Sequence, residues 1–189
     1  KEVDMPVHVH CHNDFGMATA NALSALEAGA QCADVAVNGL GERCGLPPLA
    51  EIISALVNIY KVNGNWDLGL IPGLTELVTS FSTLDAKANQ PVVGKNAFSH
   101  KAGLHVKAVV KDPRSYEAMS PESFNRERKL VIDKYTGRSA IENKFESFGI
   151  TLKKSDVNSL LKLIKSKPEK VEWTDNELIS HAKSFGIEV

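Results

Sequence analysis

The first seventy residues alternate between two hydrophobic patterns. Residues 6–10 and 32–37 are short valine-containing runs typical of strands, and apolar residues recur at helical spacing over 17–28 and again over 47–63. Gly29 follows the first helical stretch, where glycine commonly ends a helix. A β-α-β-α order with short connections predicts parallel strands covered by helices, as in a barrel or a doubly wound sheet.

The alternation stops after the fourth element. Residues 74–83 have a helical pattern, and a charged, mostly helical tail follows later, with candidate helices at 121–125, 137–148, 154–166 and 175–185. Ser155 and either Thr174 or Asp175 are the expected N-caps, and Gly149 is an expected helix end. We therefore predict a piece of an α/β domain followed by a small α-rich module.

Composition is ordinary for a globular protein. Of 189 residues, 43% are hydrophobic and 24% charged, which is enough chain for one good core or two small ones. The formal net charge of −1 gives no general attraction to nucleic acid or to an anionic membrane. We expect neither as a partner.

Several absences in the sequence point to a cytoplasmic location. No apolar run approaches the roughly 20 residues that span a bilayer, and no signal peptide opens the chain. Three widely spaced cysteines argue against a disulfide framework. The chain starts at Lys1 and soon enters a strand that would need neighbours in a parallel sheet, so we expect a fragment of a longer protein.

His10 and His12 end the first predicted strand. Side chains alternate across a strand, so His8, His10 and His12 share one face while their apolar neighbours share the other. Two imidazoles at this spacing can reach one divalent cation. The alternative is an ordinary pair of polar residues at a strand end. A polar strand exit leading into a helix favours the metal site, because sites in parallel α/β folds are built there.

Asn38 stands at the exit of the second strand. The carboxyl ends of neighbouring parallel strands converge, so Asn38 is placed to bind whatever His10 and His12 hold, although a simple Asn-Gly turn explains it equally well. The glycine-rich segment 39–45 resembles a phosphate-binding loop but lacks both nucleotide-binding spacings. Its Glu42 and Arg43 therefore either contact a ligand or pair with neighbouring side chains.

A second histidine group lies in the middle of the chain. His100 and His105 flank Lys101 and a glycine, and Tyr116 follows a short way on. Together these side chains are able to transfer protons near neutral pH. The alternative is a structural histidine satisfied by a backbone carbonyl.

Three segments together resemble one known family. They read VHCHNDFG at 9–16, VNGLGERCG at 37–45 and GKNAFSHKAGLH at 94–105. Their order and spacing are similar to those of the metal-dependent Claisen-condensing acyltransferases, homocitrate synthase, 2-isopropylmalate synthase and their relatives. The resemblance covers residues 1 to about 150. The third segment together with DPRSYE at 112–117 looks more like homocitrate synthase.

The resemblance implies a fold. We expect an α/β protein made of the last two β/α units of a TIM barrel followed by α-rich linker subdomains. Residues 1–70 would be the C-terminal portion of the catalytic barrel, 71–130 a linker subdomain with an active-site His and Tyr, and 131–189 a helical C-terminal subdomain. The family's first-strand segment, which carries an acidic metal ligand, does not occur in this sequence.

The resemblance also implies a chemistry. An enzyme of this family condenses acetyl-CoA with a 2-oxo acid and hydrolyses the thioester, with 2-oxoglutarate the favoured acceptor here and 2-isopropylmalate, citramalate or Re-type citrate synthesis the alternatives. A divalent metal, Zn, Mn or Mg, would assist the condensation. A different class of reading is a truncated, non-catalytic dimerisation module. For the 189-residue chain alone we expect no turnover.

Residue roles follow from the same resemblance. The positions matching His105 and Tyr116 reach the partner subunit's active site in the family, which implies a homodimer. The predicted metal ligands are His10, His12 and Asn38, the predicted substrate-binding residues are Asn38, Glu42 and Arg43, and the predicted catalytic residues are His105, Tyr116 and His100.

Overall fold

The computed structural model describes residues 4–82, 84–101, 106, 108–109 and 111–188. The chain forms two compact units, one of residues 1–97 with 121–126 and one of residues 98–120 with 127–189. Within the described ranges, no helix has the length and hydropathy that a membrane span needs.

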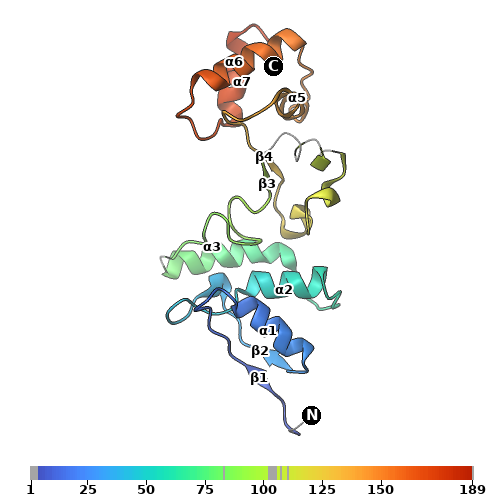
Figure 1. The fold of residues 1–189 in the computed structure, drawn as a ribbon, viewed down its shortest axis with the longest axis vertical. Coiled ribbons are helices and arrows are strands. Elements are labelled where there is room, and N and C mark those ends of the chain that lie inside the picture. Colours follow the sequence, from blue (N-terminus) through green and yellow to red (C-terminus); the bar gives the residue numbers. More distant parts are fainter. Residues whose placement is uncertain (1–3, 83, 102–105, 107, 110, 189) are drawn as a thin grey trace. The chain divides into compact units, whose positions relative to one another are not determined.

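The first unit opens with two β/α pairs, as predicted (Figure 1). Strand β1 (His8–Val9) pairs in parallel with β2 (Cys32–Ala33), and helices α1 (Ala18–Glu27) and α2 (Leu49–Asn58) follow the two strands. Gly29 ends α1 with a φ of 104°. Both strands are shorter than predicted because, among the described residues, each has a single neighbour with which to form a ladder. The prediction of an α/β fold with parallel strands is confirmed.

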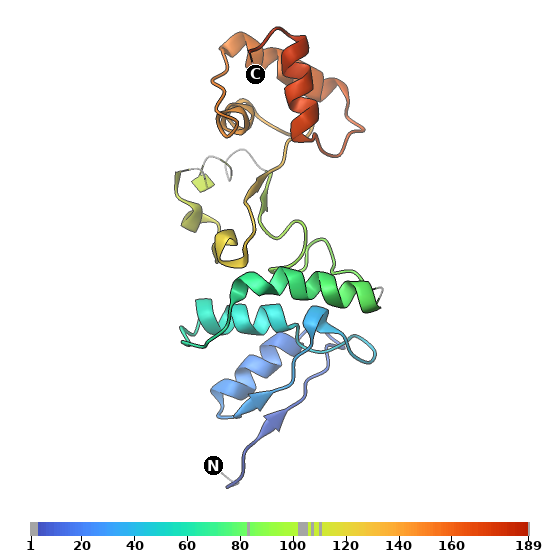
Figure 2. The same ribbon diagram turned by 180° about the vertical axis from the view of Figure 1, so that it is seen from behind.

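Helix α3 (Ile71–Ser82) belongs to the first unit and lies alongside α2 in Figures 1 and 2. It begins earlier than the predicted 74, because the Asp67 side chain accepts a hydrogen bond from Gly69 N and starts a 3-10 turn, η2 (Leu68–Leu70), that runs into the helix. The compact unit therefore continues past residue 70. The expected division into a barrel portion and two subdomains stays a prediction.

The end of the first unit is irregular but well anchored. The predicted helix at 121–125 is a 3-10 turn, η4 (Pro121–Phe124). The guanidinium of Arg126 then donates hydrogen bonds to the carbonyl oxygens of Val92 and Gly94. Val92 is only 3% exposed, so the chain around Val92 and Gly94 is folded into the unit although no helix or strand forms there.

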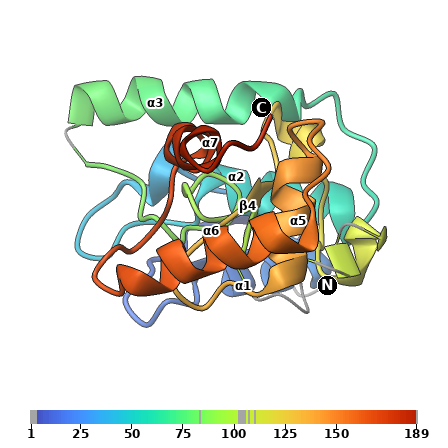
Figure 3. The same ribbon diagram turned by 90° about the horizontal axis from the view of Figure 1, so that it is seen from above.

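The second unit combines a small parallel ladder with helices. Strand β3 (Ser99–His100) pairs in parallel with β4 (Lys129–Leu130), and a 3-10 turn, η3 (Pro113–Ser115), lies between them in the sequence. The first unit contains a corresponding short turn, η1 (Val37–Gly39). Helices α5 (Arg138–Glu146), α6 (Lys154–Ser166) and α7 (Asp175–Ser184) confirm the three predicted tail helices. In Figure 3 α6 is seen lengthwise and α7 end-on, so the two cross steeply.

The core of the second unit lies between these helices. Its buried side chains come from all three helices, from the chain before α5 and from the connection between α6 and α7: Val106, Ile132, Ala140, Ile141, Phe145, Val157, Leu160, Ile164, Trp173, Leu178 and Ala182. Non-directional burial of this apolar surface is what stabilises so small a unit.

The helix ends follow the predictions with one exception. Thr174 caps α7, where its hydroxyl accepts from Glu177 N and the Glu177 carboxylate accepts from Thr174 N. Gly149 ends α5 with a φ of 78°. The prediction of Ser155 as N-cap of α6 is wrong, because Lys153 takes that position and donates its N–H to Asp156.

Candidate active site

The exits of β1 and β2 bring the first predicted ligands together. The rings of His10 and His12 lie 5.0 Å apart between centroids. In the parallel register Val9 pairs with Ala33, and one residue further on, His10 Nδ1 lies 2.9 Å from Asp34 Oδ2. A carboxylate on Nδ1 leaves Nε2 of His10 available as a ligand atom.

The imidazole pair fits a metal in part. Nδ1 of His12 is buried without a hydrogen-bond partner, which is costly unless another group satisfies it. The Asp34 contact on His10 is of the kind that orients metal-binding histidines. Yet nowhere among the described residues do three His, Cys, Asp or Glu side chains gather around one point. Zinc takes four ligands, so the pair can supply two positions and the others must come from elsewhere.

Asn38 faces helix α3. Its backbone is left-handed, with a φ of 59°, and its amide nitrogen donates to Thr75 O at 3.1 Å and to Thr79 Oγ1 at 3.2 Å. The amide oxygen is buried and has no partner. Asn38 also lines a cavity of about 10 Å³, room for about one water molecule. The structure thus describes no contact between Asn38 and the two imidazoles, and its role as ligand stays a prediction.

Arg43 joins the two strand exits. Its guanidinium donates two hydrogen bonds to the Asp14 carboxylate, at 3.0 and 3.1 Å, and the backbone of the same loops meets where Asn13 N donates to Gly45 O at 2.9 Å. Hydrogen bonding to Arg43 lowers the pKa of Asp14, and the same bond raises the pKa of Arg43. Glu42 points outward, with 87% of its side chain exposed. Substrate binding by either residue stays a prediction.

The glycine-rich turn is explained by backbone crowding. Gly45 has a φ of 85°, and a Cβ there would lie 1.9 Å from Gly39 O. Gly39 O also accepts a hydrogen bond from Leu46 N, which closes the turn before α2. The glycines therefore serve this tight turn, and the likeness to a phosphate-binding loop needs no ligand to account for it.

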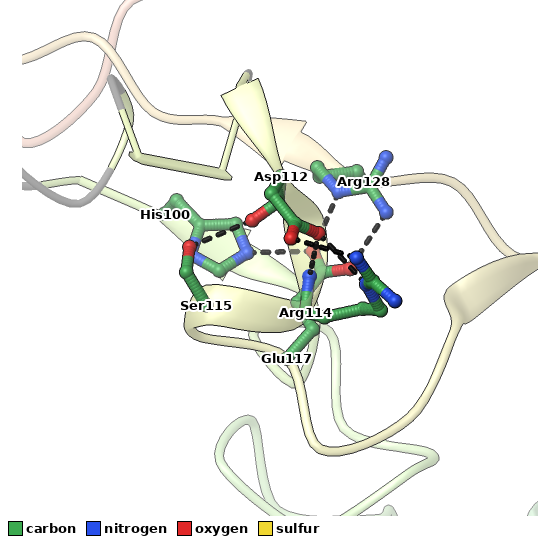
Figure 4. Close-up of polar contacts among 6 residues, drawn as sticks. All are labelled: His100, Asp112, Arg114, Ser115, Glu117 and Arg128. Atoms are coloured by element: carbon green, nitrogen blue, oxygen red, sulfur yellow. Dashed lines mark hydrogen bonds and ion pairs between the residues drawn. The ribbon is translucent and has the colours of Figure 1, made fainter.

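His100 belongs to a buried charged cluster in the second unit (Figure 4). Its Nε2 lies 2.8 Å from Glu117 Oε1, and the guanidinium of Arg128 holds both oxygens of the same carboxylate at 2.5 and 2.6 Å. The side chain of Glu117 is 6% exposed and that of His100 12%. Burial raises the pKa of Glu117, but the hydrogen bonds from Arg128 and His100 outweigh it and leave the pKa lowered.

Tyr116 lies at the end of a tight turn. Asp112 caps η3 by accepting from Arg114 N, and its carboxylate also binds the Arg114 guanidinium at 3.0 Å. Tyr116 N and Glu117 N both donate to Pro113 O. Tyr116 is about half exposed.

His105 lies outside the described residues, but its surroundings are partly visible. Val106 is fully buried in the helical core. Lys101 binds the buried Asp133 carboxylate at 2.5 Å, and this hydrogen bond raises the pKa of Lys101.

Sequence reasoning missed four residues that organise these sites. Asp34 could have been found from the register, because it stands beside His10 once the two strands are paired in parallel. Asp14 follows the histidine pair directly but gave no signal that it binds Arg43. Glu117 and Arg128 had no signal at all, since their pairing depends on how β3 and β4 associate.

Comparison with known proteins adds a family to this geometry. Residues 1–78 match a family model described as HMGL-like, and residues 92–172 match one described as homocitrate synthase post-HMGL domain-like. The two matches follow one another along the chain, separated by residues 79–91, and together they contain all three motif segments.

Full-length relatives agree with the family models. The chain is 43% identical to homocitrate synthase AksA of Methanopyrus kandleri, over 93% of this chain and 45% of that protein. It is 47% identical to the homocitrate synthase of Pyrococcus abyssi, over 89% and 46%. A probable 2-isopropylmalate synthase of Methanopyrus kandleri is 39% identical, over 89% and 34%. The chain thus spans less than half the length of these relatives.

Proposed function

Because this chain belongs to the HMGL-like family of homocitrate synthases and their relatives, we propose that it is part of an acyltransferase that condenses acetyl-CoA with a 2-oxo acid, 2-oxoglutarate being the favoured acceptor. The observation that carries the proposal is the meeting of His10, which Asp34 contacts, with His12 at a parallel strand exit. We further propose that the parent protein acts in the cytoplasm.

The proposed fold is a TIM barrel followed by two smaller subdomains. Residues 1–70 would form the last two β/α units of a TIM barrel, residues 71–130 a linker subdomain and residues 131–189 a helical subdomain. The parallel pairing of β1 and β2 supports the barrel, because strands of that fold are parallel and alternate with helices. Two β/α units cannot close a barrel on their own.

Each side chain has a proposed task in the condensation. His10 and His12, with Asn38, would hold a divalent metal, which when bound polarises a ketone as a Lewis acid. Asp34 keeps Nδ1 of His10 occupied, which leaves Nε2 to bind the metal. Arg43, fixed by Asp14, and Glu42 would lie beside the oxo acid at the rim of the strand exits.

The second unit would supply proton transfer. His105 removes a methyl proton from acetyl-CoA, the methyl carbon bonds to the ketone carbon, and water then cleaves the thioester to release the CoA thiol. Tyr116 exchanges a proton with the reacting oxygen. His100, whose Nε2 is already held by Glu117, would support this group from within the fold. In the proposed homodimer, His105 and Tyr116 act in the partner subunit's site.

The test is thiol release by the complete parent protein. It is supplied with acetyl-CoA and, in separate reactions, with 2-oxoglutarate, 2-oxoisovalerate, pyruvate or oxaloacetate, in the presence of Zn²⁺, Mn²⁺ or Mg²⁺. We expect the fastest release with 2-oxoglutarate. Faster release with 2-oxoisovalerate would support the second candidate, 2-isopropylmalate synthesis, which the similarity to the probable 2-isopropylmalate synthase of Methanopyrus kandleri favours. No release with any acceptor would refute the acyltransferase.

The 189-residue chain alone is expected to be inactive. Two imidazoles are too few ligands for a catalytic metal, and among the described residues no carboxylate joins them to complete a site. On its own the chain would then be a non-catalytic module able to associate. Condensation by the purified chain at a rate near that of the parent protein would contradict this expectation.

A further inference from the structure

The Glu117 side chain bridges the β3 strand and the residue that precedes β4. Because His100 pairs with Leu130, and Arg128 lies two residues before Leu130, the side chains of His100 and Arg128 share one face of the ladder. The Glu117 carboxylate lies on that face and binds both, at 2.8 Å to the imidazole and 2.5 to 2.6 Å to the guanidinium. Figure 4 shows it between the two side chains.

The bidentate contact fixes the orientation of the carboxylate. A guanidinium that donates two parallel hydrogen bonds to one carboxylate restricts rotation as well as distance. With 6% of the Glu117 side chain exposed, solvent has little access to compete for these bonds. The backbone of residue 117 therefore has one well-defined position over the ladder.

The anchored backbone of Glu117 also fixes the position of the residue before it, Tyr116. Tyr116 lies between the η3 turn, where Pro113 O accepts from Tyr116 N and Glu117 N at 3.1 and 3.0 Å, and the anchored Glu117 side chain. Both sides of its Cα are thus fixed, while its half-exposed ring extends from the turn. Such support on both sides is what a reacting side chain needs to be held within about 0.5 Å of its working geometry.

We propose that Glu117 is a positioning residue which, through its contacts with Arg128 and His100, sets the place of the Tyr116 phenol in the reaction. This inference rests on the proposed function, because Tyr116 transfers a proton only if the parent protein is the proposed acyltransferase. Glu117 itself touches no reacting atom.

The kinetic test uses Glu117→Gln in the complete parent protein. Glutamine has the same shape but replaces one charged acceptor with an amide, so the clamp loosens. We expect kcat to fall at least tenfold while KM for the 2-oxo acid stays within twofold, since misplacement by about 1 Å can cost on the order of 100-fold. Glu127→Gln is the control, because Glu127 is exposed and makes no described ion pair; it should keep wild-type kcat.

A double-mutant cycle separates positioning from general support. If Glu117 acts through Tyr116, Glu117→Gln should lower kcat less than twofold when added to Tyr116→Phe. An equal factor in both backgrounds would show that Glu117 acts independently and would overturn the proposal. Should Glu117→Gln fail to fold, Arg128→Lys takes its place, because lysine keeps the charge and loses the two-pronged contact.

A readout without catalysis decides the positioning on its own. The tyrosines of the complete parent protein are labelled as 3-fluorotyrosine, and the ¹⁹F resonances of the three that lie in this chain are assigned by single Tyr→Phe changes. We expect Glu117→Gln to shift or broaden the Tyr116 resonance and to leave those of Tyr60 and Tyr135 unchanged. An unmoved Tyr116 resonance would overturn the proposal. If no 2-oxo acid supports thiol release, the proposed function fails and this spectrum still tests the clamp.

Discussion

Removal of the Asp34 carboxylate should weaken metal binding without unfolding the protein. Asp34 Oδ2 lies 2.9 Å from His10 Nδ1 and so selects the tautomer in which Nε2 carries the free lone pair. In Asp34→Ala, the imidazole can turn over and exchange its two nitrogens. The His10 imidazole then has to be ordered when the metal binds, which weakens binding.

The size of the effect follows from exposure. Loss of an orienting carboxylate typically lowers metal affinity by about 10- to 100-fold. Here the side chains of His10 and Asp34 are 51% and 53% exposed, so water screens the contact and the lower end applies. We expect about a tenfold higher Kd for Mn²⁺, which corresponds to about 1.4 kcal/mol. Asp34→Asn, which can still accept from Nδ1, should lose less.

The assay is a titration of the parent protein with Mn²⁺, with free Mn²⁺ measured by its EPR signal. Manganese is preferred to zinc because the free thiols of Cys11 and Cys44 bind it poorly. Asp85→Asn is the control, since that exposed carboxylate lies in another part of the unit. An unchanged Kd in Asp34→Ala, with His10→Ala still abolishing binding, would refute the orienting role.

Three further predictions concern stability. Phe145→Ala should lower the free energy of unfolding of the second unit by roughly 3–5 kcal/mol, because this side chain is fully buried, whereas the half-exposed Phe185→Ala should cost far less; urea unfolding of both compares them. Gly45→Ala should destabilise the protein much more than Gly29→Ala, because both positions need a positive φ but only at Gly45 would a Cβ meet another atom, 1.9 Å away. Equal losses of stability in thermal unfolding would show that this crowding does not matter. Hydrogen bonds from Lys170 and from the backbone and hydroxyl of Thr174 lower the pKa of Glu177 from 4.5 to about 2, so the stability that Glu177 adds to α7 is complete above pH 4.5 and is lost as the pH falls toward 2. Glu177→Gln should abolish this acid dependence of helicity, and a dependence that persisted in the variant would contradict the assignment.

Much of the first unit was predictable because its signals are local. The β-α-β-α order, the end of α1 at Gly29 and the convergence of the two strand exits all follow from periodicity and turn chemistry. The direction of the Asn38 amide did not follow, because it depends on Thr75 and Thr79 of a helix some forty residues away. Local patterns set where a residue stands in its element, whereas distant packing sets which atoms it meets.

The second unit shows the same limit more strongly. Helices α5, α6 and α7 were predicted to within a few residues, since α6 and α7 have regular apolar stripes and Thr174 with Glu177 forms a recognisable capping box. The bounds of α6 were predicted correctly, but its N-cap was not, because the backbone N–H of Lys153, rather than a group of Ser155, is the one that pairs with Asp156. The β3–β4 ladder was not predicted at all. Two-residue strands carry no periodicity.

The two parts of the proposed site are supported in different ways, and this difference decides what substitutions there will do. At the strand exits the polar pairs, His10 with Asp34 and Arg43 with Asp14, are about half exposed, so they add little to folding. Their loops are placed instead by the backbone, through the parallel register and the bond from Asn13 N to Gly45 O. Side-chain changes at these pairs should therefore alter ligand affinity and leave stability nearly intact.

At Glu117 the order is reversed. The ladder beneath it is only two residues long, and the buried carboxylate itself holds β3, β4 and the η3 turn in one arrangement. Removing one partner of a buried, hydrogen-bonded charge leaves the others unsatisfied, which costs more than the loss of an exposed pair. Substitutions at Glu117 should thus lower stability and turnover together. This is why the Tyr116→Phe background and the Tyr116 resonance, rather than activity alone, are needed to recognise a positioning role.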